Sequence, residues 1–566
     1  MFDKETLDKI RIEKERWENE YREFFEKESK KEFFTSDGIP IKRVYTPLDL
    51  EEKNFDYIRD LGFPGEYPFT RDATFIGYRE RPYAIRQQFG ASTVEETNRL
   101  NREMMATIGQ EQMFISSDLP TKFGYDSDDP RVAGDVGRAG LAIDSVEDTM
   151  ILTEGIDLSK STVLFTCIPA TAMILALFIA AAEKQGVPLE KQSFHPQNDI
   201  LQAHIAFDEY IFPVKHGLRL AVDVGSFIAQ YMPRSKAFRV CTYHISEAGA
   251  NRIQEVAIGL SAALTYVRAV IKRGIDIELI APKIGVQGIL RYRGLLDEIA
   301  KTRAIRRIWA RIMREEFGAK NPASWAIDVH TGTGGTDLTQ DEMGMNILRS
   351  GIATLGAALA GVKAVTGCTY DEPLGIPSRH AIETGIKSRH LIADEVGVTD
   401  TVDPLAGSYY IEYMTTEIEQ RVREYMGRIE AGGGMVAAVE NGWLTYDIAA
   451  NAHKIEKQIE SGERIVIGLN KFVSEQSKQR LVEYKPIINQ EFGRTLEIQT
   501  AKLRKLKERR DNRKVQRCLE QIRAVAAKEA SKDRNLMLPI LEAAKAYATL
   551  GEITGALKDV FGSANH

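Results

Sequence analysis

The feature that most constrains the fold is a regular alternation of short apolar segments with long amphipathic ones. The short segments have the apolar composition of buried parallel strands, and helical patterns follow most of them. The predicted strands are Ala84–Gln88, Met113–Ser117, Thr162–Thr166, Ser193–Gln197, Arg239–His244, Ile277–Ile280, Trp325–His330 and Ala364–Gly367. The clearest helical patterns are Ser92–Ile108, Asn251–Lys272, Leu290–Glu316 and Leu338–Leu359. This alternation predicts an α/β protein with a closed (β/α)8 TIM barrel, although the strand number depends on where boundaries are drawn.

Three further regions flank the predicted barrel, which we place at residues 73–400. Residues 1–72 form an N-terminal arm and an extended segment, and the charged, aromatic-rich arm is either a solvated helix or a segment that wraps a partner. Residues 401–475 carry helical elements that pack on the barrel. Residues 476–566 are predicted to be a charged helical linker and a C-terminal helix, with the basic run 502–510 facing water.

Composition excludes several classes of function. The formal net charge is −6, which gives no electrostatic case for binding nucleic acid or an anionic membrane. The cysteines at 167, 241, 368 and 518 form no CxxC pair, which favours a reducing, cytoplasmic compartment and argues against disulfides or a structural zinc site. No metal site is predicted.

One segment resembles a membrane span. Residues 163–182 are almost uniformly apolar, and about 20 apolar residues suffice to cross a bilayer. Cys167-Ile168-Pro169-Ala170 interrupts this run, so a buried strand followed by a buried helix explains it better than a span does.

Three sequence blocks carry candidate chemistry. Tyr243-His244-Ile-Ser-Glu247-Ala-Gly-Ala would place His244 at the carboxyl end of a strand, which is the catalytic face of a barrel. Gln197-Asn-Asp-Ile-Leu begins at the last residue of another predicted strand. The Gly-rich block 124–145 brings Asp126, Asp128 and Asp129 together, but calcium-loop spacing is absent, so it is only a weak metal candidate.

Together with Tyr-Asp-Glu372-Pro-Leu and Ile-Gly-Leu-Asn-Lys-Phe472, these blocks resemble the adenosylcobalamin-dependent acyl-CoA mutases of the methylmalonyl-CoA mutase family. The resemblance covers about residues 40–475. It implies a radical 1,2-rearrangement in which a carbonyl-CoA group migrates to the neighbouring carbon, and the cofactor supplies the difficult step.

The resemblance also assigns roles to individual residues. His244 is expected to bond the thioester carbonyl, with Gln197 as a second polar substrate contact and Tyr243 beside them. Glu247 is expected to touch a corrin side chain, and Glu372 to hold the adenosyl ribose. On their own, Gln197 would cap the helix that follows its strand and Glu372 would be an exposed turn residue.

Two family positions set acyl specificity, and here they are Gln88 and Phe207. Methylmalonyl enzymes have tyrosine and arginine there, isobutyryl enzymes phenylalanine and glutamine, and 2-hydroxyisobutyryl enzymes isoleucine and glutamine with an added aspartate. Ser116 stands at the aspartate position, and Ser117 and Phe89 complete the predicted set. Because Phe207 cannot pair with a carboxylate, the resemblance implies an uncharged branched acyl group, while Gln88 and Ser116 leave a hydroxyl-bearing one open.

In this family the CoA chain threads the barrel, so the interior needs small or polar side chains. Ser116, Ser117, Thr166 and His195 are compatible with this. The predicted CoA-binding residues are Arg81, Arg86, Thr166, His195 and Lys283, although the surroundings of Arg81 match the family poorly and Lys283 replaces the usual arginine.

The family also binds cobalamin through Asp-x-His-x-x-Gly in a flavodoxin-like domain, which we expect this chain to lack. Asp328-Val-His330-Thr-Gly332 is one residue short of that motif and lies in a predicted strand; His330 is kept as a cofactor-binding candidate. We therefore expect a separate small subunit to bind the lower face of adenosylcobalamin. Further expected partners are a second large subunit, in a homodimer or heterotetramer, and a G-protein chaperone.

Three hypotheses follow from this sequence. The first is the large, catalytic subunit of an acyl-CoA mutase for an isobutyryl-like or bulkier group, with the 2-hydroxyisobutyryl and then the methylmalonyl enzyme as alternatives. The second is an inactive scaffold relative. The retention of the family's site residues argues against it; these are His244, Glu247, Gln197 and Glu372. The third is an unrelated barrel lyase or hydrolase, which needs a metal triad or nucleophile–base pair that we do not find.

Overall fold

The computed structural model describes residues 2–90, 92–110, 112–473 and 492–564. Within them, parallel strands form a five-stranded sheet in the order β3-β10-β9-β8-β7 and a three-stranded sheet in the order β4-β5-β6. The parallel strands are β3 (Ala84–Arg86), β4 (Met113–Ser116), β5 (Val163–Thr166), β6 (Phe194–Pro196), β7 (Phe238–Cys241), β8 (Ile284–Leu290), β9 (Asp328–Thr333) and β10 (Ala364–Thr366). The predicted α/β class with parallel strands is therefore confirmed.

One predicted strand is wrong, two others have a bound shifted by three residues, and the remaining strands lie within two residues of their predicted bounds. Residues 277–280 form the short helix α12 (Ile277–Ile280), because the Asp276 carboxylate accepts a hydrogen bond from the Glu278 amide at 2.9 Å and caps it. The strand of this region is instead β8, whose seven residues are all buried. Its two glycines and one glutamine interrupt the apolar pattern that marks a buried strand in the sequence. The predicted strand 325–330 begins instead at Asp328, after helix α14 (Pro322–Trp325).

The third difference concerns the site. Strand β7 ends at Cys241, and residues 242–247 form helix α10 (Thr242–Glu247), so His244 lies on a short helix after the strand rather than within it.

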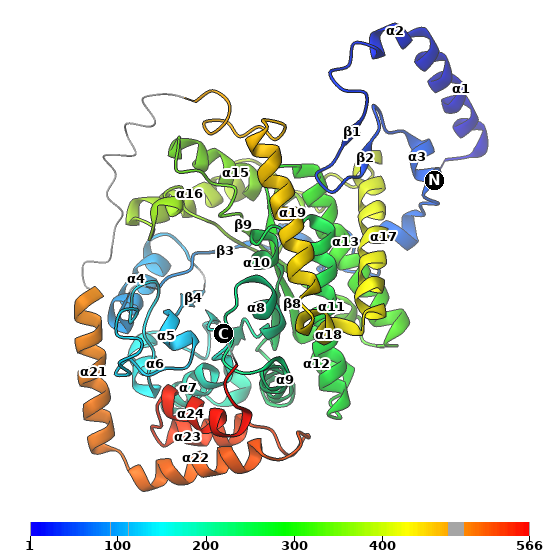
Figure 1. Ribbon diagram of the computed structural model, residues 1–566. Helices are drawn as coiled ribbons and strands as arrows, with labels where there is room; N and C mark the ends of the chain where they lie inside the picture. Colours follow the sequence, from blue (N-terminus) through cyan, green and yellow to red (C-terminus); the bar gives the residue numbers. More distant parts are fainter. Residues whose placement is uncertain (1, 91, 111, 474–491, 565–566) are drawn as a thin grey trace.

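Long helices connect and cover the strands (Figure 1). They are α4 (Val94–Thr107), α7 (Thr171–Lys184), α9 (Val214–Tyr231), α11 (Arg252–Lys272), α13 (Leu295–Arg311), α15 (Met343–Leu359) and α16 (Arg379–Asp394). Shorter helices in the connections are α5 (Leu119–Lys122), α6 (Val146–Leu152) and α8 (Ile200–Ala206). Residues 163–182 form β5 followed by α7, whose central residues are all buried, which confirms the strand–helix interpretation of that apolar run.

Helix α11 is a central element of the core. It begins with a capping box, in which the Asn251 side chain accepts from the Gln254 amide at 3.0 Å and the Gln254 side chain accepts from the Asn251 amide at 2.9 Å. Among the described helices it is the one that is long and apolar enough to cross a membrane, and 78% of that apolar window is buried inside the protein. Such burial is typical of a core helix.

Helices α17 (Tyr409–Ala431), α18 (Gly434–Glu440) and α19 (Trp443–Glu460) follow the strands, and α17 packs on α13 and α11. Buried ion pairs fix this contact. Arg303 of α13 is fully buried and pairs with Asp403 and with Glu412, the latter at 2.6 Å, and Arg307 Nε lies 2.5 Å from the Glu419 carboxylate. Removing one partner of such a pair leaves an uncompensated buried charge, which is strongly destabilising.

The C-terminal helices are α21 (Phe492–Arg509), α22 (Asn512–Ala526), α23 (Met537–Lys545) and α24 (Leu550–Phe561). The basic segment 502–510 is not a solvated linker as predicted: Leu503 and Leu506 are buried, and Arg510 forms a bidentate pair with Glu552 at 2.5 and 2.7 Å. Helices α23 and α24 pack against α7 (Figure 1).

Asp126 and Asp128 of the block 124–145 hold these C-terminal helices. The Asp126 carboxylate accepts hydrogen bonds from the Thr549 hydroxyl and the Gly551 amide, both at 2.6 Å. Lys507 lies 2.8 Å from Asp128, and Asp129 binds Arg131. These contacts give the weak metal candidates a structural role.

The N-terminal arm comprises α1 (Lys4–Glu20), α2 (Arg22–Phe25), the antiparallel strands β1 (Phe33–Phe34) and β2 (Pro40–Ile41), and α3 (Pro47–Glu52). Figure 1 shows α1 and α2 projecting from the body of the molecule. Helix α3 joins the arm to α17.

Candidate functional site

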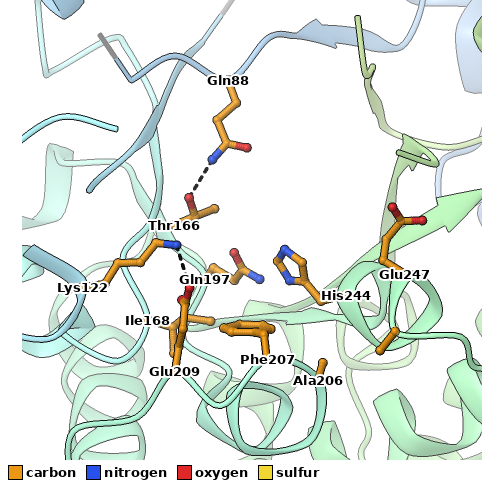
Figure 2. Close-up of a pocket in the computed structure, with 11 residues that line it drawn as sticks. Gln88, Lys122, Thr166, Ile168, Gln197, Ala206, Phe207, Glu209, His244 and Glu247 are labelled. Atoms are coloured by element: carbon orange, nitrogen blue, oxygen red, sulfur yellow. Dashed lines mark hydrogen bonds and ion pairs between the residues drawn. The ribbon is translucent and has the colours of Figure 1, made fainter. Parts of the chain in front are cut away.

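Two adjoining cavities lie at the carboxyl ends of the parallel strands. The first has a volume of about 400 Å³ and the second about 340 Å³. Gln88, Thr166, Gln197 and His244 line both cavities and therefore stand at their junction (Figure 2). Thr166 is the last residue of β5, and the other three follow β3, β6 and β7, so the backbone of the parallel sheets brings them together.

His244 is a neutral hydrogen-bonding group at this junction. Burial lowers its pKa to about 4, and the positive charge of Lys122 adds to the effect. Its Nδ1 lies 3.4 Å from Sγ of Cys241. Burial raises the pKa of that thiol to about 12, so it keeps its proton.

The amides at the junction are oriented by neighbouring side chains. Gln88 Nε2 donates to the Thr166 hydroxyl at 2.8 Å, and Gln197, which is buried, donates from Nε2 to Gln202 Oε1 at 3.4 Å. Each amide keeps a further donor or acceptor for a ligand.

The first cavity has an apolar wall made by Ile168, Ala206 and Phe207. The Phe207 ring packs edge to face against His244, with 4.9 Å between ring centroids and an interplanar angle of 69°. Phe207 directly follows α8, and the next residue, Asp208, has a left-handed backbone with φ of 52°, which turns the chain.

A lysine–glutamate pair completes this cavity, and no sequence motif predicted it. Lys122 Nζ, at the end of α5, donates to the Glu209 carboxylate at 3.2 Å (Figure 2). The two residues are 87 positions apart, so only the fold reveals the contact. Burial raises the pKa of Glu209, and the charge of Lys122 opposes that rise. We call the cavity lined by Phe207, Ile168 and this pair the acyl cavity, after the role that the sequence resemblance predicts for it.

The second cavity extends to Tyr243, Cys368 and Glu372. The Tyr243 hydroxyl accepts from the Gly335 amide at 3.3 Å and lies 3.4 Å from Cys368 Sγ. One Glu372 oxygen accepts from the Thr369 amide at 3.1 Å, and burial raises the pKa of this carboxyl. Glu247 lines the acyl cavity and is held by Arg291 and by the Thr336 amide and hydroxyl.

Of the predicted specificity residues, Gln88 and Phe207 line the acyl cavity, whereas Phe89, Ser116 and Ser117 line neither cavity. Phe89 is 4% exposed and packs in a separate apolar cluster. Side chains alternate between the two faces of extended chain, so with Gln88 pointing inward Phe89 points away.

The predicted CoA-binding residues likewise divide into those that line the cavities and those that lie elsewhere. Thr166 is at the cavity junction, while Arg81 is exposed and Arg86 contacts Gln112 at 2.6 Å. The interior residue His195 has a pKa lowered to about 3 by burial and by the charge of Arg86.

Lys283 is engaged elsewhere. Its Nζ donates to the carbonyl oxygens of Met232, Pro233 and Ser235 at 2.9, 3.0 and 3.2 Å, so it holds the turn before β7 and has little capacity left for CoA.

The predicted cofactor residue His330 lies inside β9, away from Glu247 and Glu372 at the strand ends. Its Nδ1 is 2.8 Å from Arg86 Nη1, and burial with that positive neighbour lowers its pKa far below the usual value. Its place is therefore in the strand interior, where it accepts a hydrogen bond from Arg86.

The fold and the site define a class of protein that comparison with known sequences identifies. Residues 34–563 match the family described as Methylmalonyl-CoA mutase. The chain belongs to this family and is an isomerase of the cobalamin-dependent acyl-CoA mutase class, as the sequence motifs predicted.

Among its relatives is the 2-hydroxyisobutanoyl-CoA mutase large subunit of Aquincola tertiaricarbonis, which is 37% identical over 557 residues, covering 98% of this chain and 97% of the relative. Human mitochondrial methylmalonyl-CoA mutase is 37% identical over 528 residues, covering 93% of this chain and 68% of the relative. The methylmalonyl-CoA mutase of Cereibacter sphaeroides is 36% identical over 530 residues, covering 93% and 72%.

Proposed function

We propose that this chain is the large, substrate-binding and catalytic subunit of an adenosylcobalamin-dependent mutase for an uncharged, branched short-chain acyl-CoA, isobutyryl-like or bulkier. The observation that carries the proposal is the composition of the acyl cavity. Its wall is the Phe207 ring, and its lysine, Lys122, already has a partner in Glu209 at 3.2 Å. A substrate carboxylate would lose its hydration there without gaining a counter-charge.

In this proposal the protein groups at the junction bind and orient the thioester. When the Cys241 thiol donates to Nδ1 of His244, the ring proton is on Nε2, which can donate to the thioester carbonyl oxygen. The amides of Gln88 and Gln197 fix the thioester from the other strands. Phe207 and Ile168 exclude water from the migrating carbon skeleton.

The donor set fits the cofactor that the family uses. Glu372 lines the second cavity, and a buried carboxyl suits the hydroxyl groups of the adenosyl ribose. Glu247, at the rim, can accept from an amide side chain of the corrin. When bound, adenosylcobalamin supplies the organic radical that removes a substrate hydrogen atom.

We propose that the parallel strands close into a (β/α)8 barrel. In support, the Phe89 amide donates to the Phe114 carbonyl at 2.9 Å and the Ser116 amide donates to the Phe89 carbonyl at 2.8 Å, which joins the β3 side to β4. On the other side, the Phe194 amide of β6 donates to the Ser235 hydroxyl, just before β7, at 3.0 Å.

A separate small subunit is proposed to bind the lower face of the cofactor. The name of the Aquincola relative, a large subunit that this chain matches over almost its whole length, supports this. A second large subunit and a G-protein chaperone are further proposed partners, and the exposed aromatic residues of the arm, among them Phe24 and Phe34, support a protein contact there. The cysteines at 167, 241, 368 and 518 are free thiols, which supports a reducing, cytoplasmic location.

A 2-hydroxyisobutyryl-CoA mutase is the second candidate, favoured by the 37% identity to the Aquincola relative and by the Gln88 amide at the junction. The test is to mix the purified chain with a cobalamin-binding small subunit, adenosylcobalamin and a panel of acyl-CoAs. The proposal expects a rearranged product from isobutyryl-CoA or a bulkier branched homologue. Fastest turnover of the hydroxylated substrate favours the second candidate, and no carbon-skeleton product from any substrate refutes both.

A further inference from the structure

Arg239 is a buried arginine without a hydrogen-bond partner among the described residues. It belongs to β7, is 3% exposed and lines the second cavity, and all three of its guanidinium nitrogens are unpartnered. Its guanidinium lies over the ring of Phe114, with 5.0 Å between the guanidinium carbon and the ring centroid. Burial lowers its pKa only to about 10, so it stays charged at neutral pH. A buried, unpaired charge is costly, and proteins rarely keep one without a use.

Another buried arginine shows what a structural role looks like. Arg306 of α13 donates to the carbonyl oxygens of Phe69 and Thr70 at 2.9 to 3.3 Å, so its charge is solvated by backbone. Arg239 has no such set of acceptors, which sets it apart from a guanidinium that merely braces the fold.

A second polar group in the same cavity is also unpartnered. Gln287 of β8 is 7% exposed, and its Oε1 accepts no hydrogen bond from the described residues. On the neighbouring strand β8, Gly285 is the register partner of Arg239, and Gln287 is the register partner of Cys241. Because Gly285 has no side chain, no side chain from that position separates the guanidinium from the amide, and both line the same cavity. The cavity therefore presents a donor and an acceptor that face the same volume.

The position of this pair relative to the thioester site is defined by the strand. Arg239 and Cys241 point to the same face of β7, two residues or about 7 Å apart along it. Cys241 contacts His244, which lines the cavity junction. Arg239 thus lies one layer deeper than the thioester, on the side away from Phe207 and the acyl cavity.

We propose that Arg239 and Gln287 bind the carrier arm of the acyl thioester at its first amide group. This inference rests on the proposed function, in which the ligand is an acyl-CoA. The amide nearest the sulfur stands a few bonds along the arm, and it offers both a carbonyl oxygen and an N–H. The Arg239 guanidinium donates to that oxygen, and Gln287 Oε1 accepts from that N–H. The acyl group occupies the apolar cavity, and the polar arm passes into the cavity that holds the unpartnered polar atoms.

The test compares two truncated thioesters with the full-length chain. S-isobutyryl-N-acetylcysteamine keeps the first amide, and S-butyl thioisobutyrate lacks it. The wild-type chain is expected to bind the first compound about 10- to 100-fold more tightly, the range for hydrogen bonds to a charged group. In Arg239→Met this preference falls to about threefold or less, and Gln287→Leu lowers it in the same direction. An unchanged preference in both variants, or no binding of either thioester to the wild type, overturns the proposal.

Stability of the ligand-free chain gives a second readout with a matched control. Arg239→Met removes an unpaired charge, so its urea midpoint is expected to rise, whereas Arg306→Met leaves backbone acceptors unpaired and its midpoint falls. A fall for Arg239→Met equal to that of Arg306→Met shows a bracing role and overturns the proposal.

The mutase assay separates this inference from the proposed function. If the chain prefers the amide-containing thioester but rearranges no acyl-CoA, the proposed function is refuted and the amide site stands. If the chain rearranges an acyl-CoA but Arg239→Met keeps the wild-type preference for the amide-containing thioester, only the amide site is refuted.

Discussion

Substituting Glu209 by glutamine is expected to change which acyl group the cavity accepts. Glu209→Gln keeps the shape of the side chain but removes the charge that neutralises Lys122, whose Nζ lies 3.2 Å from the carboxylate. The lysine then becomes an unpaired cation in the acyl cavity, and a substrate carboxylate can take the place of Glu209. The variant should gain affinity for methylmalonyl-CoA.

The geometry sets the size of this gain. Two unit charges 3.2 Å apart at an effective dielectric constant of about 20 attract by about 5 kcal/mol. The side chains are 21% and 18% exposed, so desolvation and screening offset part of this attraction. A charge-assisted hydrogen bond of about 1.5–3 kcal/mol remains, which corresponds to about 10- to 150-fold in the dissociation constant.

The assay is equilibrium binding of methylmalonyl-CoA and isobutyryl-CoA to the wild type, to Glu209→Gln and to the double variant with Lys122→Met. Isobutyryl-CoA should bind Glu209→Gln within about threefold of the wild type, because it makes no charged contact. The double variant should lose the gain. If Glu209→Gln binds methylmalonyl-CoA no better than the wild type, the lysine–glutamate pair is not what keeps a carboxylate out.

Four further predictions concern His244 and the buried ion pairs. His244→Gln should lower kcat/KM by about 10- to 100-fold through loss of the thioester hydrogen bond, with an unchanged thermal midpoint; a loss below threefold contradicts the role. Because the pKa of His244 is about 4, kcat should stay constant from about pH 8 to 5.5, and a fall centred on pH 6.5 argues against a neutral imidazole. Because folding depresses the pKa of His244, its contribution to the unfolding free energy is full above pH 6.5 and is lost as the pH falls toward 4. The total loss is about 3 kcal/mol at most. In urea titrations at different pH values, His244→Gln should make the unfolding free energy depend less steeply on pH. Arg303→Met should cost about 3–5 kcal/mol of unfolding free energy, whereas Arg99→Met, on an exposed pair, should cost about 0.5 kcal/mol; equal effects contradict the buried-pair argument.

The junction of the site could be predicted because its residues stand at strand ends within long motifs. Gln197 and His244 belong to such motifs, and Gln88 and Thr166 were placed by the strands that carry them. The same pattern could not say which of two consecutive residues faces inward. Gln88 lines the cavity whereas Phe89 packs in the core behind it, since a shift of one residue reverses the face.

Other features required the fold itself. The Lys122–Glu209 pair joins segments 87 residues apart, and neither residue belongs to a recognisable pattern. Arg239 lies in a predicted strand, where an arginine is ordinarily paired, and only the three-dimensional contacts show that it is not. Strand β8 was predicted seven residues too early because the glycines at 285 and 288 break its apolar run, and Gly285 leaves no side chain on the strand face that carries Gln287.

The central claim is that the acyl cavity selects an uncharged branched group, and the ratio of kcat/KM for isobutyryl-CoA to that for methylmalonyl-CoA tests it most directly. The measurement uses the chain reconstituted with a small subunit and adenosylcobalamin. Phe207 and the paired Lys122 predict a ratio well above one, by about 100-fold or more if the carboxylate is left unpaired. A ratio below one, with methylmalonyl-CoA the better substrate, would contradict the account.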